Sequence, residues 1–169
     1  MSPDRTVVLV RHATAEAGGA LGDRARPLAQ RGRRQARDLG PRLSGHVGAF
    51  DVALVSSALR ATETYRLLAA DGPDYPEPRV LDELYEARAR QVLGALRALP
   101  ETVRRVIVVG HEPTMSSAAA LLHDARDDLA LQLGVGIPTA TACVVDVAGA
   151  WQDLDRDGGR VRAILRPED

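Results

Sequence analysis

The sequence predicts an α/β fold in which helices alternate with the strands of a buried sheet. Residues 6–10 form an aliphatic run without polar alternation, which is typical of a strand covered on both faces. Residues 105–109 repeat this pattern, and segments with helical periodicity lie between the two runs. A histidine follows each run, and the carboxyl ends of strands face the ligand crevice in an open α/β sheet. His12, with Arg11 beside it, and His111 are therefore expected at one binding site; alternatively, each histidine only caps its strand.

The composition indicates an ordinary globular protein with an aliphatic core. A chain of 169 residues is long enough for one domain with a proper core, and we expect a single domain over residues 1–169. Apolar residues make up 45% and charged residues 27%, whereas aromatic residues make up only 3%. The formal net charge of −1 argues against a general nucleic-acid binder.

The residue types and segments that the sequence lacks limit where the protein can be located and which reactions it can catalyse. No apolar run reaches the length of a membrane span and the first five residues do not resemble a signal peptide, so a cytoplasmic protein without a membrane partner is expected. Cys143 is the single cysteine, which excludes an internal disulfide and a cysteine metal cluster. All 22 basic residues are arginines, which excludes a P-loop and Schiff-base chemistry because both need a lysine.

The first half of the chain alternates loops, helices and one further strand. Residues 15–26 predict a loop beside the site, and residues 27–43 predict a helix. Several arginines on that helix could indicate a nucleic-acid patch, but a solvated face fits the acidic balance elsewhere better. Residues 51–55 predict a strand, and the serines that follow it predict a cap for a helix over residues 58–70.

Arg60 lies in the first turn of that helix, at the same sheet edge as Arg11. A cation at a helix N-terminus is disfavoured by the helix dipole, so this placement suggests that Arg60 pairs with an anion. The alternative is an exposed helix arginine.

The second half of the chain predicts a strand over residues 79–81, a helix over 87–99 and a helix over 113–122. Three tail segments predict strands with an antiparallel edge: residues 139–147, 150–154 and 160–165. Asp153 to Gly158 mimics the start of a calcium loop, but the twelfth position would be Ile164 instead of a glutamate. We therefore interpret it as a hairpin turn.

The groups at the strand ends favour phosphate chemistry. The guanidinium groups of Arg11 and Arg60 match the planar, bidentate recognition of a phosphate. A metal site fits poorly, because Arg11 beside His12 would repel a cation. Once arginines balance the charge of a phosphate, an imidazole nitrogen can attack phosphorus in line and form a covalent intermediate.

Three motifs resemble, in this order, signatures of the histidine phosphatase superfamily, the phosphoglycerate mutase-like proteins. Residues 8–13 (VLVRHA) resemble its Arg-His-Gly signature, with Ala13 in place of the glycine. Residues 56–64 (SSALRATET) resemble its second arginine motif, and residues 109–113 (VGHEP) its second histidine motif. The short chain, with D-x-x-R-P-L from Asp23 and residues 83–87 (ELYEA), is most similar to the SixA-type phosphohistidine phosphatase branch.

The resemblance implies a three-layer α/β/α sandwich around a mostly parallel central sheet. It implies that His12 is the nucleophile, that Arg11, Arg60 and His111 bind the phosphoryl group, and that Arg26 is a further anion contact. No metal or other cofactor is implied.

The proton donor is left open by the sequence. Many superfamily members place a carboxylate after the third strand, where Glu83 stands, but Glu86 competes and Glu83 can equally be a surface residue. Only 28 positions separate Glu83 from His111, so no cap domain is expected and the pocket should be open.

The leading hypothesis is a metal-independent phosphatase for phosphohistidine, other phosphoramidates or small phosphoesters. Its partner would be a phosphate-containing substrate such as a phosphohistidine protein, with neither nucleic acid nor membrane involved. A phosphosugar or phosphoglycerate-type phosphatase or mutase is the second hypothesis, and the missing cap argues against it. A non-catalytic phosphate-binding module is the third; the intact pair of histidines with both arginines argues against that.

Overall fold

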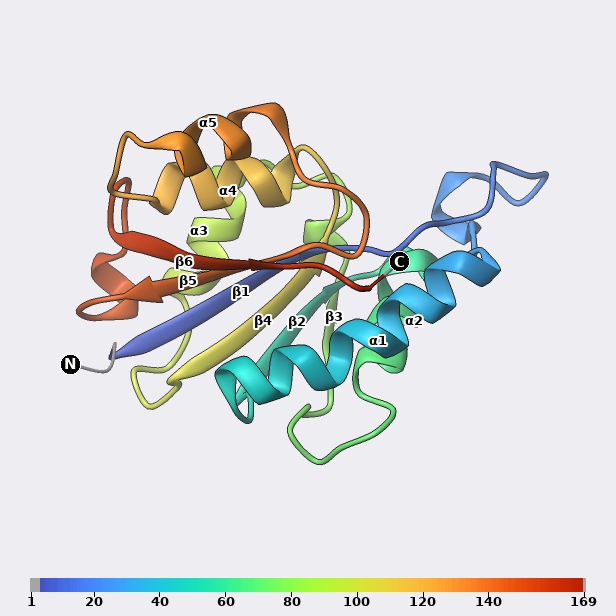
Figure 1. The fold of residues 1–169 in the computed structure, drawn as a ribbon, viewed down its shortest axis with the longest axis horizontal. Coiled ribbons are helices and arrows are strands. Elements are labelled where there is room, and N and C mark those ends of the chain that lie inside the picture. Colours follow the sequence, from blue (N-terminus) through green and yellow to red (C-terminus); the bar gives the residue numbers. More distant parts are fainter. Residues whose placement is uncertain (1–3, 169) are drawn as a thin grey trace.

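The computed structural model describes residues 4–168, and they build a six-stranded mixed sheet (Figure 1). The strand order is β3-β2-β4-β1-β5-β6, with the first four strands parallel and β5 antiparallel to both of its neighbours. The strands are β1 (Arg5–Arg11), β2 (Val52–Ser56), β3 (Arg79–Leu81), β4 (Arg105–Gly110), β5 (Ala142–Val147) and β6 (Gly159–Leu165). The predicted α/β class and the antiparallel edge are confirmed.

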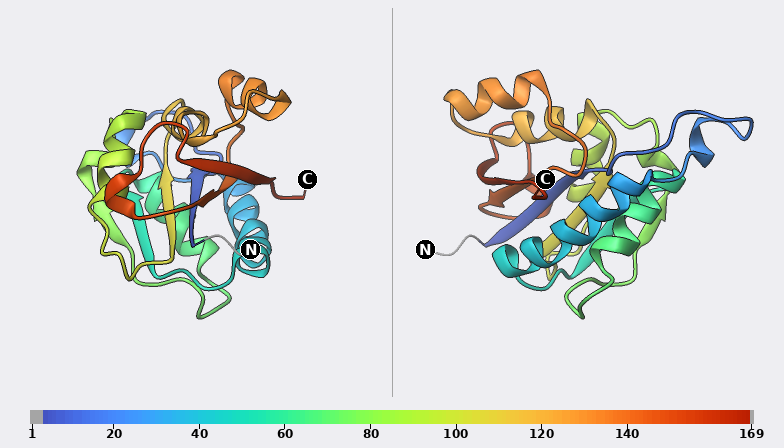
Figure 2. Two further views of the ribbon diagram at one scale, coloured as in Figure 1. Left: turned by 90° about the vertical axis from the view of Figure 1, so that its left-hand side faces the viewer. Right: turned by 45° about the vertical axis from the view of Figure 1, so that its right-hand side comes forward.

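Helices cover both faces of the sheet and make the structure three layers deep. The helices are α1 (Gln30–Val47), α2 (Leu59–Leu68), α3 (Ala89–Arg97), α4 (Thr114–Leu122) and α5 (Asp128–Val135). Three short 3₁₀ helices are η1 (Asp23–Ala25), η2 (Asp82–Leu84) and η3 (Trp151–Asp153). Helices α1 and α2 pack on one face, α3 and α4 on the other, and α5 lies outside α4 (Figures 1 and 2).

The central strand β1 shows why its sequence is aliphatic throughout. Val8 and Val10 pack in the cluster with α1 and α2, whereas Val7 and Leu9 pack in the cluster with α3 and α4. All four side chains are fully buried. Because successive strand residues point to opposite faces, a strand between two helical layers needs apolar residues at every position.

The start of α1 and the cap of α2 differ from the predictions. Helix α1 begins at Gln30 and not at residue 27, because Leu28 is still extended: it bridges to Ala15, and its N–H donates to a Glu63 carboxylate oxygen at 2.7 Å. Helix α2 has Ala58 at its N-cap with no side-chain capping bond, so the predicted serine cap is wrong.

The predicted strand over residues 150–154 is also wrong, since Trp151–Asp153 forms the 3₁₀ helix η3. The indole of Trp151 is fully buried and donates to the Val103 carbonyl at 2.8 Å. Its backbone N–H donates to a Glu101 carboxylate oxygen at 3.0 Å, so it is not available to a strand partner. Helix α5 had no counterpart in the predictions.

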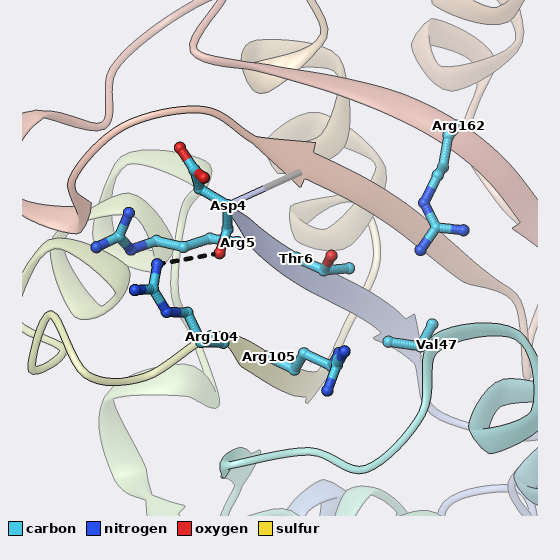
Figure 3. Close-up of a pocket in the computed structure, with 7 residues that line it drawn as sticks. All are labelled: Asp4, Arg5, Thr6, Val47, Arg104, Arg105 and Arg162. Carbon is cyan, nitrogen blue, oxygen red and sulfur yellow. Dashed lines mark hydrogen bonds between the residues drawn. The ribbon is translucent and has the colours of Figure 1, made fainter. Parts of the chain in front are cut away.

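The amino end of the parallel strands carries a pocket of about 350 Å³, shown in Figure 3. We call it the arginine pocket; it is lined by Asp4, Arg5, Thr6, Val47, Arg104, Arg105 and Arg162. Arg104 Nη1 donates to the Asp4 carbonyl at 3.3 Å (Figure 3). A second pocket lies at the carboxyl end of the same strands and collects the predicted site residues.

Candidate active site

The pocket at the carboxyl end has a volume of about 360 Å³, and we call it the histidine pocket. It is lined by Arg11, His12, Asp23, Arg26, Arg60, Tyr85, Glu86, His111 and Glu112. These residues come from the ends of β1 and β4, the first turn of α2, and the segments around η1 and η2. The ring centroids of His12 and His111 are 5.2 Å apart, so the structure brings together the histidines of two parallel neighbouring strands.

The hydrogen bonds of His12 determine which of its nitrogens carries the proton. Nδ1 lies 2.8 Å from the Ala13 carbonyl oxygen, which can only accept, so Nδ1 carries the hydrogen. Nε2 then carries the lone pair of the ring, which accepts from Arg60 Nε at 3.3 Å. Nε2 is therefore the nitrogen of His12 that can act as a nucleophile.

Both pocket histidines are neutral at pH 7. Burial lowers the pKa of His12 to about 4, and the nearby positive charges of Arg60, Arg11 and Arg26 act in the same direction. Burial likewise lowers the pKa of His111 to about 4, with smaller contributions from His12 and Arg60. Neutral imidazole is the form that retains a nucleophilic lone pair.

His111 has the opposite tautomer. Its Nδ1 lies 3.4 Å from Arg60 Nη2, a permanent donor, so Nδ1 accepts there. Its Nε2 therefore carries the hydrogen and donates to Ser56 Oγ at 2.8 Å. Ser56 is the buried last residue of β2, and its Oγ holds the His111 ring while also accepting from the Ala58 N–H at 3.3 Å.

Arg60 is the centre of the hydrogen-bond network, and at 7% exposure it is buried, unlike an ordinary surface arginine. Besides its contacts to the two imidazoles, Nη1 donates to the Asp23 carbonyl at 2.9 Å and Nη2 to Asp23 Oδ2 at 3.1 Å. A carboxylate thus accompanies the cation at the start of α2. Desolvation of this guanidinium strengthens its attraction for an anion.

Two further arginines leave donors free at the pocket. Arg11 Nη1 donates to the Ile137 carbonyl at 2.9 Å, and Arg26 Nη1 donates to Asp23 Oδ1 at 3.3 Å. The Nε atoms of Arg11 and Arg26 are buried and have no hydrogen-bond partner among residues 4–168. Because a buried donor without a partner is costly, these atoms fit a site that receives an anionic ligand.

Two neighbouring residues hold this geometry in place. Thr64 Oγ1 accepts from the Ala13 N–H at 3.0 Å and donates to the Arg60 carbonyl at 2.6 Å, which couples the end of β1 to α2. Glu112 accepts from the N–H groups of Ser116, at 2.9 Å, and Ile137, at 3.1 Å. Glu112 thereby stabilises the loop that contains Ile137, whose carbonyl accepts from Arg11.

The two candidate proton donors lie in and just after the 3₁₀ helix η2. Glu83 is exposed on η2 and does not line the histidine pocket, whereas Glu86 does. Tyr85 also lines the pocket, with its ring edge-on to His111 at 5.7 Å between centroids. Sequence reasoning assigned no role in the site to Tyr85, Glu112, Ser56 or Asp23, although each stands in one of the motifs that carry the family resemblance.

Two further properties concern the described part of the chain. Within residues 4–168, no group of three or more histidine, cysteine, aspartate or glutamate side chains is arranged to hold a metal ion. In the same region, none of the helices combines the length and apolar character that a membrane crossing needs.

Comparison with known proteins defines the family. Residues 7–89 match the model of the histidine phosphatase superfamily (branch 1). The uncharacterized protein Rv1276c of Mycobacterium tuberculosis is 35% identical over 149 residues, which cover 86% of this chain and 92% of the relative. The uncharacterized protein ML1117 of Mycobacterium leprae is 34% identical, covering 87% and 90%. The chain belongs to the histidine phosphatase superfamily.

Solved structures define the branch. A candidate phosphohistidine phosphatase SixA from Nakamurella multipartitia superposes with a TM-score of 0.86 at 32% identity, covering 98% of this chain and 97% of that one. The protein histidine phosphatase SixA complexed with tungstate superposes with a TM-score of 0.78 at 25% identity, covering 96% and 97%. The chain is thus of the SixA type within the superfamily.

Proposed function

We propose that this protein is a metal-independent phosphatase that transfers a phosphoryl group first to His12 and then to water. The observation that carries the proposal is the neutral Nε2 of His12. Its lone pair lies among three arginines, and its hydrogen is held on the opposite ring nitrogen by the Ala13 carbonyl. This arrangement combines an activated nucleophile with charge that stabilises the phosphoryl group in transit.

The first step forms a bond between Nε2 and phosphorus while the bond from phosphorus to the leaving group breaks. The leaving group departs with the bonding electron pair and takes a proton if it is strongly basic. Arg11, Arg26 and Arg60 balance the charge on the phosphoryl oxygens. An anion at this position favours protonation of His111, which turns both of its ring nitrogens into donors toward Ser56 and the phosphoryl group.

The second step returns the enzyme to its starting state. A water oxygen attacks phosphorus, the bond to Nε2 breaks, and its electron pair returns to His12. One proton of the water is released to solvent as inorganic phosphate leaves. The Nδ1 hydrogen stays on the Ala13 carbonyl throughout, so the same nitrogen is ready for the next cycle.

The substrate class that fits this pocket is phosphohistidine and other phosphoramidates. Of the structurally similar SixA proteins, one is named a candidate phosphohistidine phosphatase and another a protein histidine phosphatase. An imidazole leaving group is weakly basic, with a conjugate-acid pKa of about 6.5 in the free side chain, so it departs with little help from an acid. Glu83, at the family's usual acid position, is away from the pocket, which agrees with a substrate that needs no strong proton donor.

The experiment that tests the proposal is trapping of the intermediate. Turnover of a labelled phosphoramidate, quenched rapidly without acid, should leave one acid-labile phosphoryl group per chain. His12→Ala should abolish the label, and His46→Ala, at an exposed position of α1, should retain it. Label that persists in His12→Ala would place the nucleophile elsewhere, and binding without turnover would indicate a phosphate-binding module.

A further inference from the structure

Asp23 places a carboxylate inside the histidine pocket. The residue begins η1, in the loop that projects from the carboxyl end of the sheet (Figure 1). Its Oδ2 lies 3.1 Å from Arg60 Nη2, and its Oδ1 lies 3.3 Å from Arg26 Nη1. The Tyr85 hydroxyl also donates to Oδ2. One anion therefore bridges two of the arginines to which the proposed function assigns the phosphoryl group.

The charge state of Asp23 agrees with this position. The hydrogen bond from Tyr85 lowers the pKa of the carboxyl, and Arg60 and Arg26 lower it further. Asp23 is therefore ionised at neutral pH. A carboxylate that spans two guanidinium groups resembles the contact that a phosphate makes with the same donors.

Four contacts of the Arg60 guanidinium are made in this arrangement, and Nη2 makes two of them, to Asp23 Oδ2 and to His111 Nδ1. Nη1 donates to the Asp23 carbonyl, Nη2 donates to the carboxylate, and Nε points at His12. A phosphoryl oxygen can bind Nη2 only if the carboxylate leaves it. The two anions also repel each other at such short separations, so both cannot keep the best position.

The surrounding contacts allow the carboxylate to leave without displacing Arg60. The main-chain carbonyl of Asp23 keeps its bond to Nη1 when only the side chain rotates. The neck of the loop is held separately by the bridge between Ala15 and Leu28 and by the bond from Leu28 to Glu63. The Asp23 side chain is 52% exposed, so it has solvent to rotate into.

We propose that Asp23 is an internal anion that occupies Arg60 and Arg26 in the free enzyme and is displaced by the phosphoryl group. Asp23 is then a positioning residue: it keeps the guanidinium groups aligned while the pocket is unliganded. It also lowers the affinity of the pocket for inorganic phosphate, the product, and so promotes product release. This inference rests on the proposed function, because it takes the phosphoryl group to bind these arginines.

The test is the affinity for inorganic phosphate, measured by titration calorimetry on the full chain. Asp23→Asn keeps the size and the main-chain carbonyl but removes the competing charge, so it should bind phosphate roughly tenfold more tightly. Asp23→Ala should change affinity in the same direction. The matched control is Asp82→Asn, because Asp82 pairs with Arg24 at 3.0 Å and not with the pocket arginines. Its phosphate affinity should equal that of the wild type.

The outcomes separate this proposal from the proposed function. Unchanged or weaker phosphate binding in Asp23→Asn would overturn the internal-anion role, because a merely structural residue can only weaken the site when it is changed. Equal tightening in Asp82→Asn would also overturn it, since the effect would then be one of net charge. If neither the wild type nor any variant binds phosphate, or if Arg60→Ala binds it normally, the proposed function fails as well.

Discussion

The two ends of the parallel strands carry pockets of nearly equal volume, about 350 Å³ at the amino end and about 360 Å³ at the carboxyl end. Both are lined by several arginines. In the arginine pocket, Arg5 Nη2 is paired with Glu101 at 2.6 Å and Arg162 Nε is paired with Asp146 at 2.8 Å. Its lining residues include no histidine. Those arginines tie strands and loops together.

The histidine pocket differs in what its arginines contact. Arg60 donates to two imidazoles whose tautomers follow from their partners. Unpartnered buried Nε atoms occur at both ends, on Arg11 and Arg26 here and on Arg5 in the arginine pocket, so they do not distinguish the two. A cluster of guanidinium groups therefore occurs at both ends, and only the histidine pocket combines it with histidines. What distinguishes the carboxyl end is a neutral imidazole with an accepting nitrogen held among those groups, as the loops at that end of an α/β sheet permit.

The strongest test of this comparison exchanges one arginine for lysine at each end. Arg60→Lys keeps the charge but loses the planar fork that reaches both histidines, so kcat/KM for para-nitrophenyl phosphate should fall roughly 10²- to 10³-fold. Arg105→Lys, in the arginine pocket, should leave the rate within about twofold, as is usual for a surface change remote from a site. A near-normal rate in Arg60→Lys would mean that Arg60 acts only through its charge, and similar losses in both variants would mean that the effect is not specific to the carboxyl end.

A second test concerns the two glutamates around η2. Glu86→Gln should slow an alkyl phosphate roughly 10²-fold, at the lower end of the range for a general acid, because an alkoxide needs a proton as it leaves. Phosphohistidine and para-nitrophenyl phosphate should slow much less. Glu83→Gln is the matched control, since Glu83 is exposed outside the pocket. If Glu83→Gln shows the selective loss instead, the acid reaches the pocket by a movement of η2.

The third test concerns the pH at which His12 and His111 become protonated in the free enzyme. It predicts no change in the rate at neutral pH. The pKa of His12 and that of His111 are both lowered to about 4, so these rings should stay neutral as the pH falls through 6.5 and gain their protons only near pH 4. NMR titration of the ring protons would show this, with assignments from His12→Ala and His111→Ala. Midpoints near 6.5 would show that both rings are open to solvent.

The central strands and the main residues of the candidate site could be predicted from the local sequence pattern. Strands covered on both faces need aliphatic residues at each position, so β1 and β4 were visible as uninterrupted runs. The residues that follow the strands meet at one end of a parallel sheet, so His12, His111 and Arg60 could be assigned to one site before any coordinates. The structure brings these three residues together, along with Arg11 and Arg26.

Other features depended on contacts between distant parts of the chain. The segment around Trp151 has strand-like composition, but the indole bond to Val103 makes it a 3₁₀ helix. Glu83 and Glu86 are equivalent in sequence, and only the path of η2 directs one of them to the pocket. The pairing of Asp23 with Arg60 joins two residues 37 positions apart.

The sequence by itself determined the fold class and the set of residues that chemistry could use. The tertiary structure alone decided which nitrogen of each histidine carries the proton and how low its pKa lies. The tautomers follow from the partners that folding supplies, the Ala13 carbonyl for His12, and Arg60 with Ser56 for His111. The lowered pKa values follow from burial beside those cations. Hydrogen bonding and desolvation depend on neighbours in space, and sequence order does not specify them.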